Sequence, residues 1–152
     1  MNGAPALPPS PPACTCATLR RFSRRLSAIY DRHLAAAGLT TNQYSLLMTL
    51  HVAGPSPLGR LARRAAMDRT TLTRLIAPLA RAGWVESRPG TDPRQRILAL
   101  TGAGRDRLAA AQPHWRAAQD RIETALGADS VGQLHAAVAQ AMPRLRALLP
   151  SG

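Results

Sequence analysis

The stretch MDRTTLTRLIAPLARAGWVESRPGTDPRQRILALT, residues 67–101, decides the fold of this chain. In its first half, apolar residues at helical spacing follow Asp68, which can cap a helix, and Gly83 can end that helix. In its second half, two short β-prone runs, residues 84–88 and 96–100, flank a segment rich in turn-forming residues. The stretch therefore predicts one helix followed by a small β-hairpin.

The segment before this stretch predicts a further short helix. Ser56-Pro57 resembles an N-cap followed by proline at the first helical position, and the helix extends to about Ala65. Two short helices separated by a turn of about three residues have the spacing of a helix-turn-helix. Together with the hairpin, the region from Leu58 to Thr101 is therefore expected to form a winged helix-turn-helix.

Long amphipathic helices are expected on both sides of this unit. Apolar residues recur every three or four positions over Thr15–Ala37, again after Thr101, and once more over Ser130–Leu149. These apolar faces exceed what the central unit can cover. Pairing with the same regions of a second copy is the simplest way to bury them.

The charge of the chain indicates a polyanionic partner. Its net charge is +12, all twenty of its cations are arginines, and nine of them lie between Arg60 and Arg96 beside only three acids. Such a concentration favours nucleic acid or an anionic membrane surface. No apolar run approaches the ~18 residues that span a bilayer, and the proline-rich residues 1–13 lack the cationic start of a secretory signal. We therefore expect double-stranded DNA as the partner, no membrane association and a cytoplasmic location.

The second helix of the pair is expected to contact base edges. Its short hydroxyl side chains allow a close approach to DNA, and arginine can bind guanine through two hydrogen bonds. The tip of the hairpin is expected to anchor the protein in an adjacent minor groove, and Asp92 is expected to organise that loop rather than contact phosphate. The candidate DNA-binding residues are Arg69, Thr70, Thr71, Thr73, Arg74, Arg94 and Arg96.

These motifs resemble the MarR (multiple antibiotic resistance regulator) family. The resemblance rests on Met67–Arg74, Leu79–Val85, Asp92–Arg96 and Leu100–Gly104, and it extends over most of residues 14–149. It implies an obligate homodimer that binds a pseudo-palindromic operator, usually to repress, and that is released by a small aromatic or phenolic acid or by cysteine oxidation.

The resulting expectation is a mainly α protein with a small β-wing. Residues 1–13 are expected to form a disordered arm, and residues 14–152 a single MarR-like domain. Within that domain, residues 14–40 and 102–150 are expected to supply the dimerisation helices, and residues 41–101 the DNA-binding lobe.

A pocket for an aromatic anionic effector is expected between the first, second and fifth helices. Aromatic and polarizable side chains would line it, and an arginine could pair with a carboxylate. Each of these side chains could instead belong to an ordinary core or surface. The candidate residues are Arg20, Arg24, Tyr30, His33, Tyr44, Met48, His51 and Trp115.

Cys14 and Cys16 leave three interpretations open: a redox switch, small apolar fillers near the dimer interface, or soft-metal ligands. The organic-hydroperoxide sensors of the family carry a reactive cysteine seven residues before a Ser-Arg pair, and Cys16 stands seven before Ser23-Arg24. Those sensors also use tyrosine hydroxyls near the cysteine. In this chain only Tyr30 stands where one of these tyrosines is expected. A C-x-C pair supplies too few ligands for a metal site within one chain, so no metal and no cofactor is expected.

Two other classes of function compete with a regulator. An enzyme is not expected, because no nucleophile-base pair, paired carboxylates or glycine-rich phosphate loop is found. A non-specific architectural DNA-binding protein would explain the charge, but it would not need hydroxyl side chains between arginines on an exposed helix.

Overall fold

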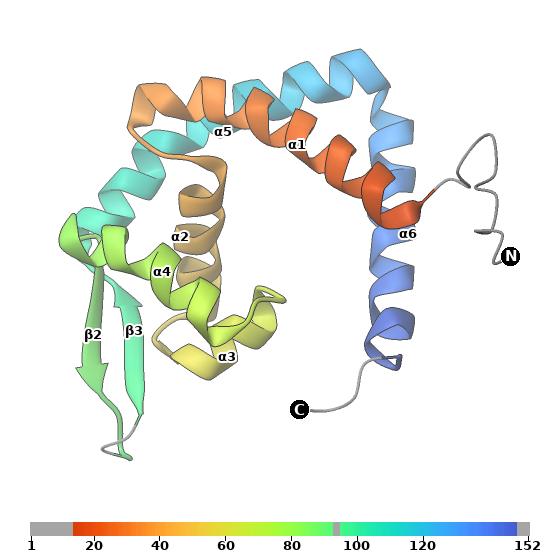
Figure 1. The fold of residues 1–152 in the computed structure, drawn as a ribbon. Coiled ribbons are helices and arrows are strands. Elements are labelled where there is room, and N and C mark those ends of the chain that lie inside the picture. Colours follow the sequence, from red (N-terminus) through yellow and green to blue (C-terminus); the bar gives the residue numbers. More distant parts are fainter. Residues whose placement is uncertain (1–13, 93–94, 149–152) are drawn as a thin grey trace, which may run out of the picture.

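The computed structural model describes residues 14–92 and 95–148, so the expected N-terminal arm and Arg94 lie outside the described residues. Figure 1 shows α2, α3, α4 and the strands gathered into one lobe, while α1, α5 and α6 extend beyond it. None of the described helices is both long enough and apolar enough to cross a membrane. In chain order the elements are α1 (Thr15–Leu34), the 3-10 helix η1 (Ala35–Ala37), α2 (Thr41–Ala53), β1 (Ser56–Pro57), α3 (Leu58–Arg64), α4 (Arg69–Arg81), β2 (Val85–Pro89), β3 (Arg96–Leu100), α5 (Gly102–Leu126) and α6 (Ala128–Arg146).

A helix-turn-helix followed by a β-wing lies at the centre of the chain, which confirms the fold predicted from the sequence. The helix α4 begins at Arg69 because the side chain of Asp68 accepts a hydrogen bond from the backbone N–H of Thr71, at 2.8 Å. It ends at Arg81, and Gly83, at φ +74°, turns the chain into β2.

The wing contains three strands rather than the predicted two. β2 and β1 pair antiparallel with opposite edges of β3, so that Ser87 and Ser56 both face Leu98. The prediction that Ser56 caps α3 is therefore wrong: Pro57 occupies the N-cap position without a side-chain cap, and the Ser56 hydroxyl donates to the Ala53 carbonyl. Local sequence could not reveal this, because the strand pairs with a partner far along the chain.

The corner between α1 and α2 is fixed by helix caps. Helix α1 ends at Leu34, because the last predicted turn tightens into the 3-10 helix η1 before Gly38 at φ +64°. Thr40 and Gln43 form a reciprocal capping box at the start of α2. The hydroxyl and backbone N–H of Thr41 both donate to Asp31 Oδ1, at 2.6 Å, and so tie α2 to α1.

One hydrophobic core lies beneath the helix-turn-helix. It joins the end of α1 with α2, α3, α4, the wing and the first half of α5. From α4 it takes Leu72, Ile76 and Leu79, and Leu75, which the sequence predicts on the same inward face, packs half-buried against it. Because these side chains are locked in a close-packed interior, the opposite face of α4 is presented to solvent in a fixed orientation.

The helix α6 takes almost no part in this core. Of its described residues only Val131 is buried, while the apolar side chains of Val138, Met142 and Leu145 remain exposed, Leu145 by 54%. In Figure 1 this blue helix stands apart from the lobe. A helix with an uncovered apolar stripe of this length normally packs against a partner.

Candidate nucleic-acid interface

The solvent-facing side of α4 carries the five candidate residues that the sequence assigns to it. All five are exposed, and they surround the part of the helix that lies opposite the buried leucines: Arg69, Thr70, Thr71, Thr73 and Arg74. An exposed helix of this kind, with short hydroxyl side chains, fits the width of the DNA major groove.

The structure divides these residues by their hydrogen bonds. The Thr71 hydroxyl donates to Asp68 Oδ2 at 2.6 Å and belongs to the helix cap, while the Thr73 hydroxyl donates to the Arg69 carbonyl at 2.8 Å. Their hydroxyl protons are therefore used within the helix, which leaves methyl groups and oxygen lone pairs for an approaching base. Thr70 and Arg74 have no such internal bond in the described part of the chain.

The Asp68 carboxyl group that caps α4 is ionised at neutral pH. The hydroxyl and backbone N–H of Thr71 hold the pKa of its carboxyl below the ordinary value of 3.8. A group with a lowered folded pKa contributes stability above its unfolded pKa and loses it as the pH falls through the folded value. The start of α4 is therefore insensitive to pH throughout the neutral range.

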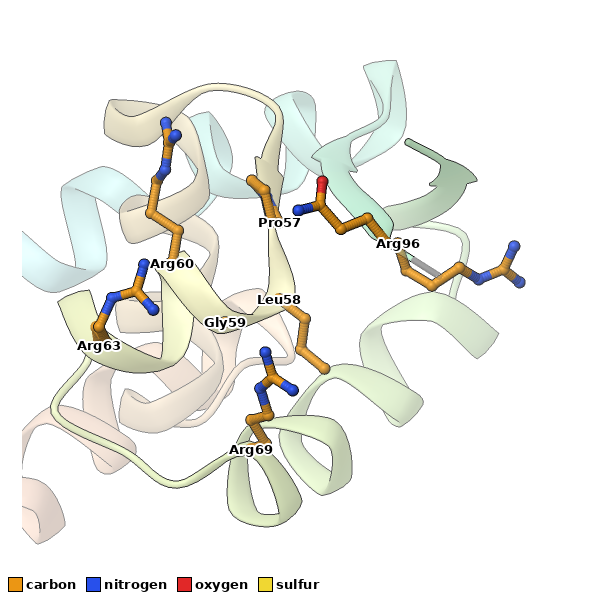
Figure 2. Close-up of a pocket in the computed structure, with 8 residues that line it drawn as sticks. Pro57, Leu58, Gly59, Arg60, Arg63, Arg69 and Arg96 are labelled. Atoms are coloured by element: carbon orange, nitrogen blue, oxygen red, sulfur yellow. The ribbon is translucent and has the colours of Figure 1, made fainter. Parts of the chain in front are cut away.

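An arginine notch opens beside the start of α4. It has a volume of about 280 Å³, and the described residues that line it include four arginines and no acid. Figure 2 shows Arg69 pointing from α4 toward the first turn of α3, with Arg60 and Arg63 rising from α3 and the end of Arg96 directed outward. We call this site the arginine notch; its lining residues are Pro57, Leu58, Gly59, Arg60, Arg63, Arg69, Gln95 and Arg96.

Gly59 makes room for Arg69 in the notch. A Cβ added at Gly59 would stand 2.8 Å from Arg69 Nη2 and 3.5 Å from Cζ and Nε. The guanidinium therefore lies directly over the glycine. In this position Arg69 is directed toward α3, which differs from the base-edge orientation expected from its place in α4.

The wing loop is closed by backbone hydrogen bonds. The Gln95 N–H donates to the Asp92 carbonyl at 2.8 Å, and the Gly90 N–H donates to the Gln95 carbonyl at 2.9 Å. Arg96 is exposed at the start of β3. The organising role expected of the Asp92 side chain stays a prediction, as does the minor-groove role of Arg94.

The root of the wing is locked to the start of α5. The Thr101 hydroxyl donates to the Gly83 carbonyl at 2.6 Å, and the Thr101 N–H donates to the Trp84 carbonyl at 3.1 Å. The guanidinium of Arg107 lies 4.9 Å from the centre of the Trp84 ring and donates to the Ala37 carbonyl. Wing, α5 and the α1–α2 corner are thus held as one unit.

The candidate effector residues do not line one common cavity. Tyr44 is buried and stacks on Trp115 at a ring separation of 6.1 Å, and burial raises the pKa of its phenol although the charge of Arg116 opposes the rise. Met48 and His51 line a separate cavity of about 340 Å³ between α2 and α5. His33 is half-buried on α1.

Arg20 and Arg24 lie in a different place, an apolar concavity of about 670 Å³ between α1 and the end of α6. Cys16, Leu19 and Leu145 line it with them. We call it the α1–α6 concavity.

The two cysteines are exposed thiols at the start of α1. The Cys14 sulfur caps that helix by accepting from the Ala17 N–H at 3.5 Å. The Tyr30 hydroxyl donates to Gln119 Oε1 on α5, and burial, aided by the charge of Glu123, raises the pKa of Tyr30. Within this chain Tyr30 therefore bonds to α5 rather than to Cys16.

Sequence reasoning missed Gly59, Arg60 and Arg63 as site residues. The available signal was the spacing of Arg60 and Arg63, which places both arginines on one face of α3. The side chain of Arg69 meets that face only because the tertiary packing of α3 against α4 brings it there.

Known proteins resemble this chain in sequence and in fold. A sequence model of the MarR family matches residues 39–95. The M. tuberculosis transcriptional regulator MosR, solved in complex with DNA, is 36% identical with a TM-score of 0.76, and the match covers 88% of this chain and 98% of that one.

One further solved structure is less similar in sequence, and one curated relative matches over a shorter stretch. A cysteine-to-serine mutant of E. coli MarR bound to operator DNA has a TM-score of 0.77 over 84% of this chain and 93% of that one; at 21% identity this likeness concerns the fold alone. The HTH-type transcriptional repressor YetL of Bacillus subtilis is 31% identical over 90 residues, which is 57% of this chain and 54% of that protein. The chain spans between half and two thirds of the length of the curated relatives it matches.

Proposed function

We propose that this chain, which belongs to the MarR family, is a DNA-binding transcriptional regulator that represses its targets by binding a pseudo-palindromic operator as a homodimer. The observation that carries this proposal is the exposed face of α4, where Thr70, Thr73 and Arg74 stand together above a buried leucine face. Inserted in the major groove, this face brings a bidentate donor and threonine methyl groups to the base edges. Acting on chromosomal DNA, the protein would work in the bacterial cytoplasm.

The electrostatics of the lobe support DNA as the partner. Nine arginines lie between residues 60 and 96, and the only ion pair between described residues joins Arg88 to Glu86. Cations that are not paired within the protein remain available to neutralise phosphates and release counterions.

Dimerisation follows from the exposed apolar residues of the terminal helices. Leu19 on α1 and Leu126, Val138, Met142 and Leu145 on α5 and α6 are all exposed in the single chain. A two-fold related copy offers the same surface and can bury it on both sides. Two lobes held at a fixed spacing would then meet successive major grooves of a palindromic site.

Regulation would follow as a population shift. An effector that binds between the terminal helices favours a lobe spacing that no longer matches the grooves, and the protein leaves the DNA. The effector can lower operator affinity by no more than the factor by which it prefers one spacing over the other.

The first test compares specific with non-specific binding. By fluorescence anisotropy at physiological salt, the wild-type protein is expected to bind its own upstream region about 10³-fold or more tightly than random DNA. The Arg74→Ala variant is expected to lose about 1–3 kcal/mol of binding to the operator and little on random DNA, because a base contact is removed.

Arg121→Ala is the matched control for this test, since it removes one exposed arginine on α5, outside the lobe. Equal affinity of the wild type for both DNAs would favour the architectural alternative. Equal losses from Arg74→Ala and Arg121→Ala would contradict a base-contacting role for Arg74.

We propose a small aromatic carboxylate as the effector and the α1–α6 concavity as its site. The apolar lining suits an aromatic ring, and Arg20 and Arg24 suit a carboxylate. A thiol switch is the second candidate, because Cys16 lines the same concavity beside these arginines. A hydroperoxide would oxidise this exposed thiol to the sulfenic acid and would itself be reduced to the alcohol.

One experiment separates the two signals. A panel of benzoates and hydroxynicotinates, and separately an organic hydroperoxide, is added to the wild type and to the Cys16→Ser variant on operator DNA. An aromatic effector is expected to release both proteins and to raise their melting temperatures. Release by the hydroperoxide of the wild type alone would establish the thiol switch, and the absence of any response to the panel would remove the aromatic effector.

A further inference from the structure

The four guanidinium groups of the arginine notch lack protein counter-charges. No acid is among the described residues that line the notch, and no ion pair between described residues involves Arg60, Arg63, Arg69 or Arg96. Asp68, the acid next to Arg69 in sequence, uses its carboxylate to cap α4 through Thr71. Like charges that line one concave site repel each other and raise its positive potential, which favours an anion there.

The shape of the notch favours a phosphate oxyanion. Guanidinium groups are planar forks that match phosphate oxygens in pairs. Gly59 allows the Arg69 fork to lie over the first turn of α3, the element from which Arg60 and Arg63 also rise (Figure 2). The Arg69 guanidinium therefore already lies in the notch without any ligand, which favours binding.

The position of the notch indicates where such a phosphate would come from. Arg69 immediately precedes Thr70 at the start of α4, and Arg96 begins the strand that carries the wing. If α4 occupies the major groove, an anion at its first residue lies at the edge of that groove, where the DNA backbone runs.

We propose that the arginine notch binds a phosphodiester of the DNA backbone, and that Gly59 is a positioning residue that leaves room for Arg69 in this site. The proposal rests on the proposed DNA-binding function. It adds a backbone contact that fixes the position of the protein along the DNA without distinguishing the bases. Arg69 thereby anchors the backbone, and discrimination between bases is left to Thr70, Thr73 and Arg74.

The test measures the slope of log affinity against log salt concentration on operator and on random DNA. Each phosphate contact contributes about 0.9 to this slope, so Arg69→Ala or Arg63→Ala is expected to lower it by about 1.8 in a dimer. Affinity for the two DNAs should fall by the same factor, which leaves their ratio unchanged. Arg121→Ala, which removes an equal charge outside the notch, should leave the slope within error of the wild type.

Gly59→Ala tests the positioning role separately from folding. The added Cβ meets the mobile end of the Arg69 side chain, and alanine favours a helix more than glycine does. The melting temperature is therefore expected to hold or rise while the salt slope falls. In an Arg69→Ala background, Gly59→Ala should cause no further fall in the slope; a further fall of the same size would overturn the role of Gly59.

Two outcomes would overturn the phosphodiester assignment. The first is a salt slope that Arg69→Ala leaves unchanged or that Arg121→Ala lowers equally. The second outcome has two parts: inorganic phosphate at constant ionic strength stabilises the wild type saturably but not Arg69→Ala, and the salt slopes on DNA are the same for both proteins. This result would identify free phosphate as the ligand. Failure of the regulator proposal can be told apart from failure of the phosphodiester assignment. It would appear as equal affinity of the wild type for operator and random DNA, independently of the results for the notch variants.

Discussion

The Gly104→Ala variant is expected to lose about 3 kcal/mol of stability and about 10 °C of melting temperature. A Cβ at this buried position would stand 2.1 Å from the Trp84 carbonyl oxygen and 2.9 Å from its carbon. These are backbone atoms, and that oxygen already accepts a hydrogen bond from the Thr101 N–H. To relieve the contact, α5 must move away from the wing root.

Gly102→Ala is the matched control for this prediction. Gly102 lies in the same helical turn, but a Cβ there meets only Arg105 Nη2 at 4.0 Å. Because alanine is the better helix former, this variant should be as stable as the wild type or slightly more stable. Thermal unfolding of the three proteins at one concentration checks the prediction, and a Gly104→Ala protein as stable as Gly102→Ala would contradict the packing argument.

Leu145→Glu is expected to produce a monomer that binds operator DNA about 10²–10⁴-fold more weakly. Leu145 is 54% exposed on α6 and lines the α1–α6 concavity, so a carboxylate there leaves the single chain intact. In a dimer the same carboxylate would be taken out of water within an apolar interface, and this desolvation is costly even beside Arg20 and Arg24. Each lobe would then bind alone, without the effective concentration that a second lobe supplies.

Val52→Glu provides the control for Leu145→Glu. Val52 is an exposed apolar residue on α2, within the lobe and away from α6, so this change introduces the same charge at a similar degree of exposure. Analytical ultracentrifugation together with anisotropy on operator DNA gives both quantities. A Leu145→Glu protein that remains dimeric would show that this face of α6 is not the interface.

Several elements of the site were predictable from sequence because their causes are local. Asp68 and Gly83 mark the ends of α4 through their own backbone preferences, and the spacing of Leu72, Ile76 and Leu79 fixes which side of that helix is buried. The strand β3 was predicted at its observed bounds, because a run of β-prone residues directly follows a segment of turn-forming residues there.

Other elements depended on residues distant in sequence. Ser56 has a good side chain for capping a helix, but its backbone pairs with Leu98 and makes it a strand. The stacking of Tyr44 on Trp115 likewise requires α2 and α5 to meet, and it joins a core residue to a partly buried one at the edge of the core. Helical spacing alone cannot distinguish an aromatic residue in the core from one that lines a pocket.

By itself the sequence determined three features: α4 presents threonines and arginines to solvent, a β-wing follows it, and the terminal helices carry apolar surface that the central unit cannot cover. These features follow from helix caps, turn chemistry and hydrophobic periodicity, which act over a few residues. Only the tertiary structure decided that Arg69 lies over Gly59 among the arginines of the notch, and that Cys16, Arg20 and Arg24 share a concavity with Leu145. Both arrangements join side chains from different helices, and they arise where packed helices cross rather than from spacing along one chain segment.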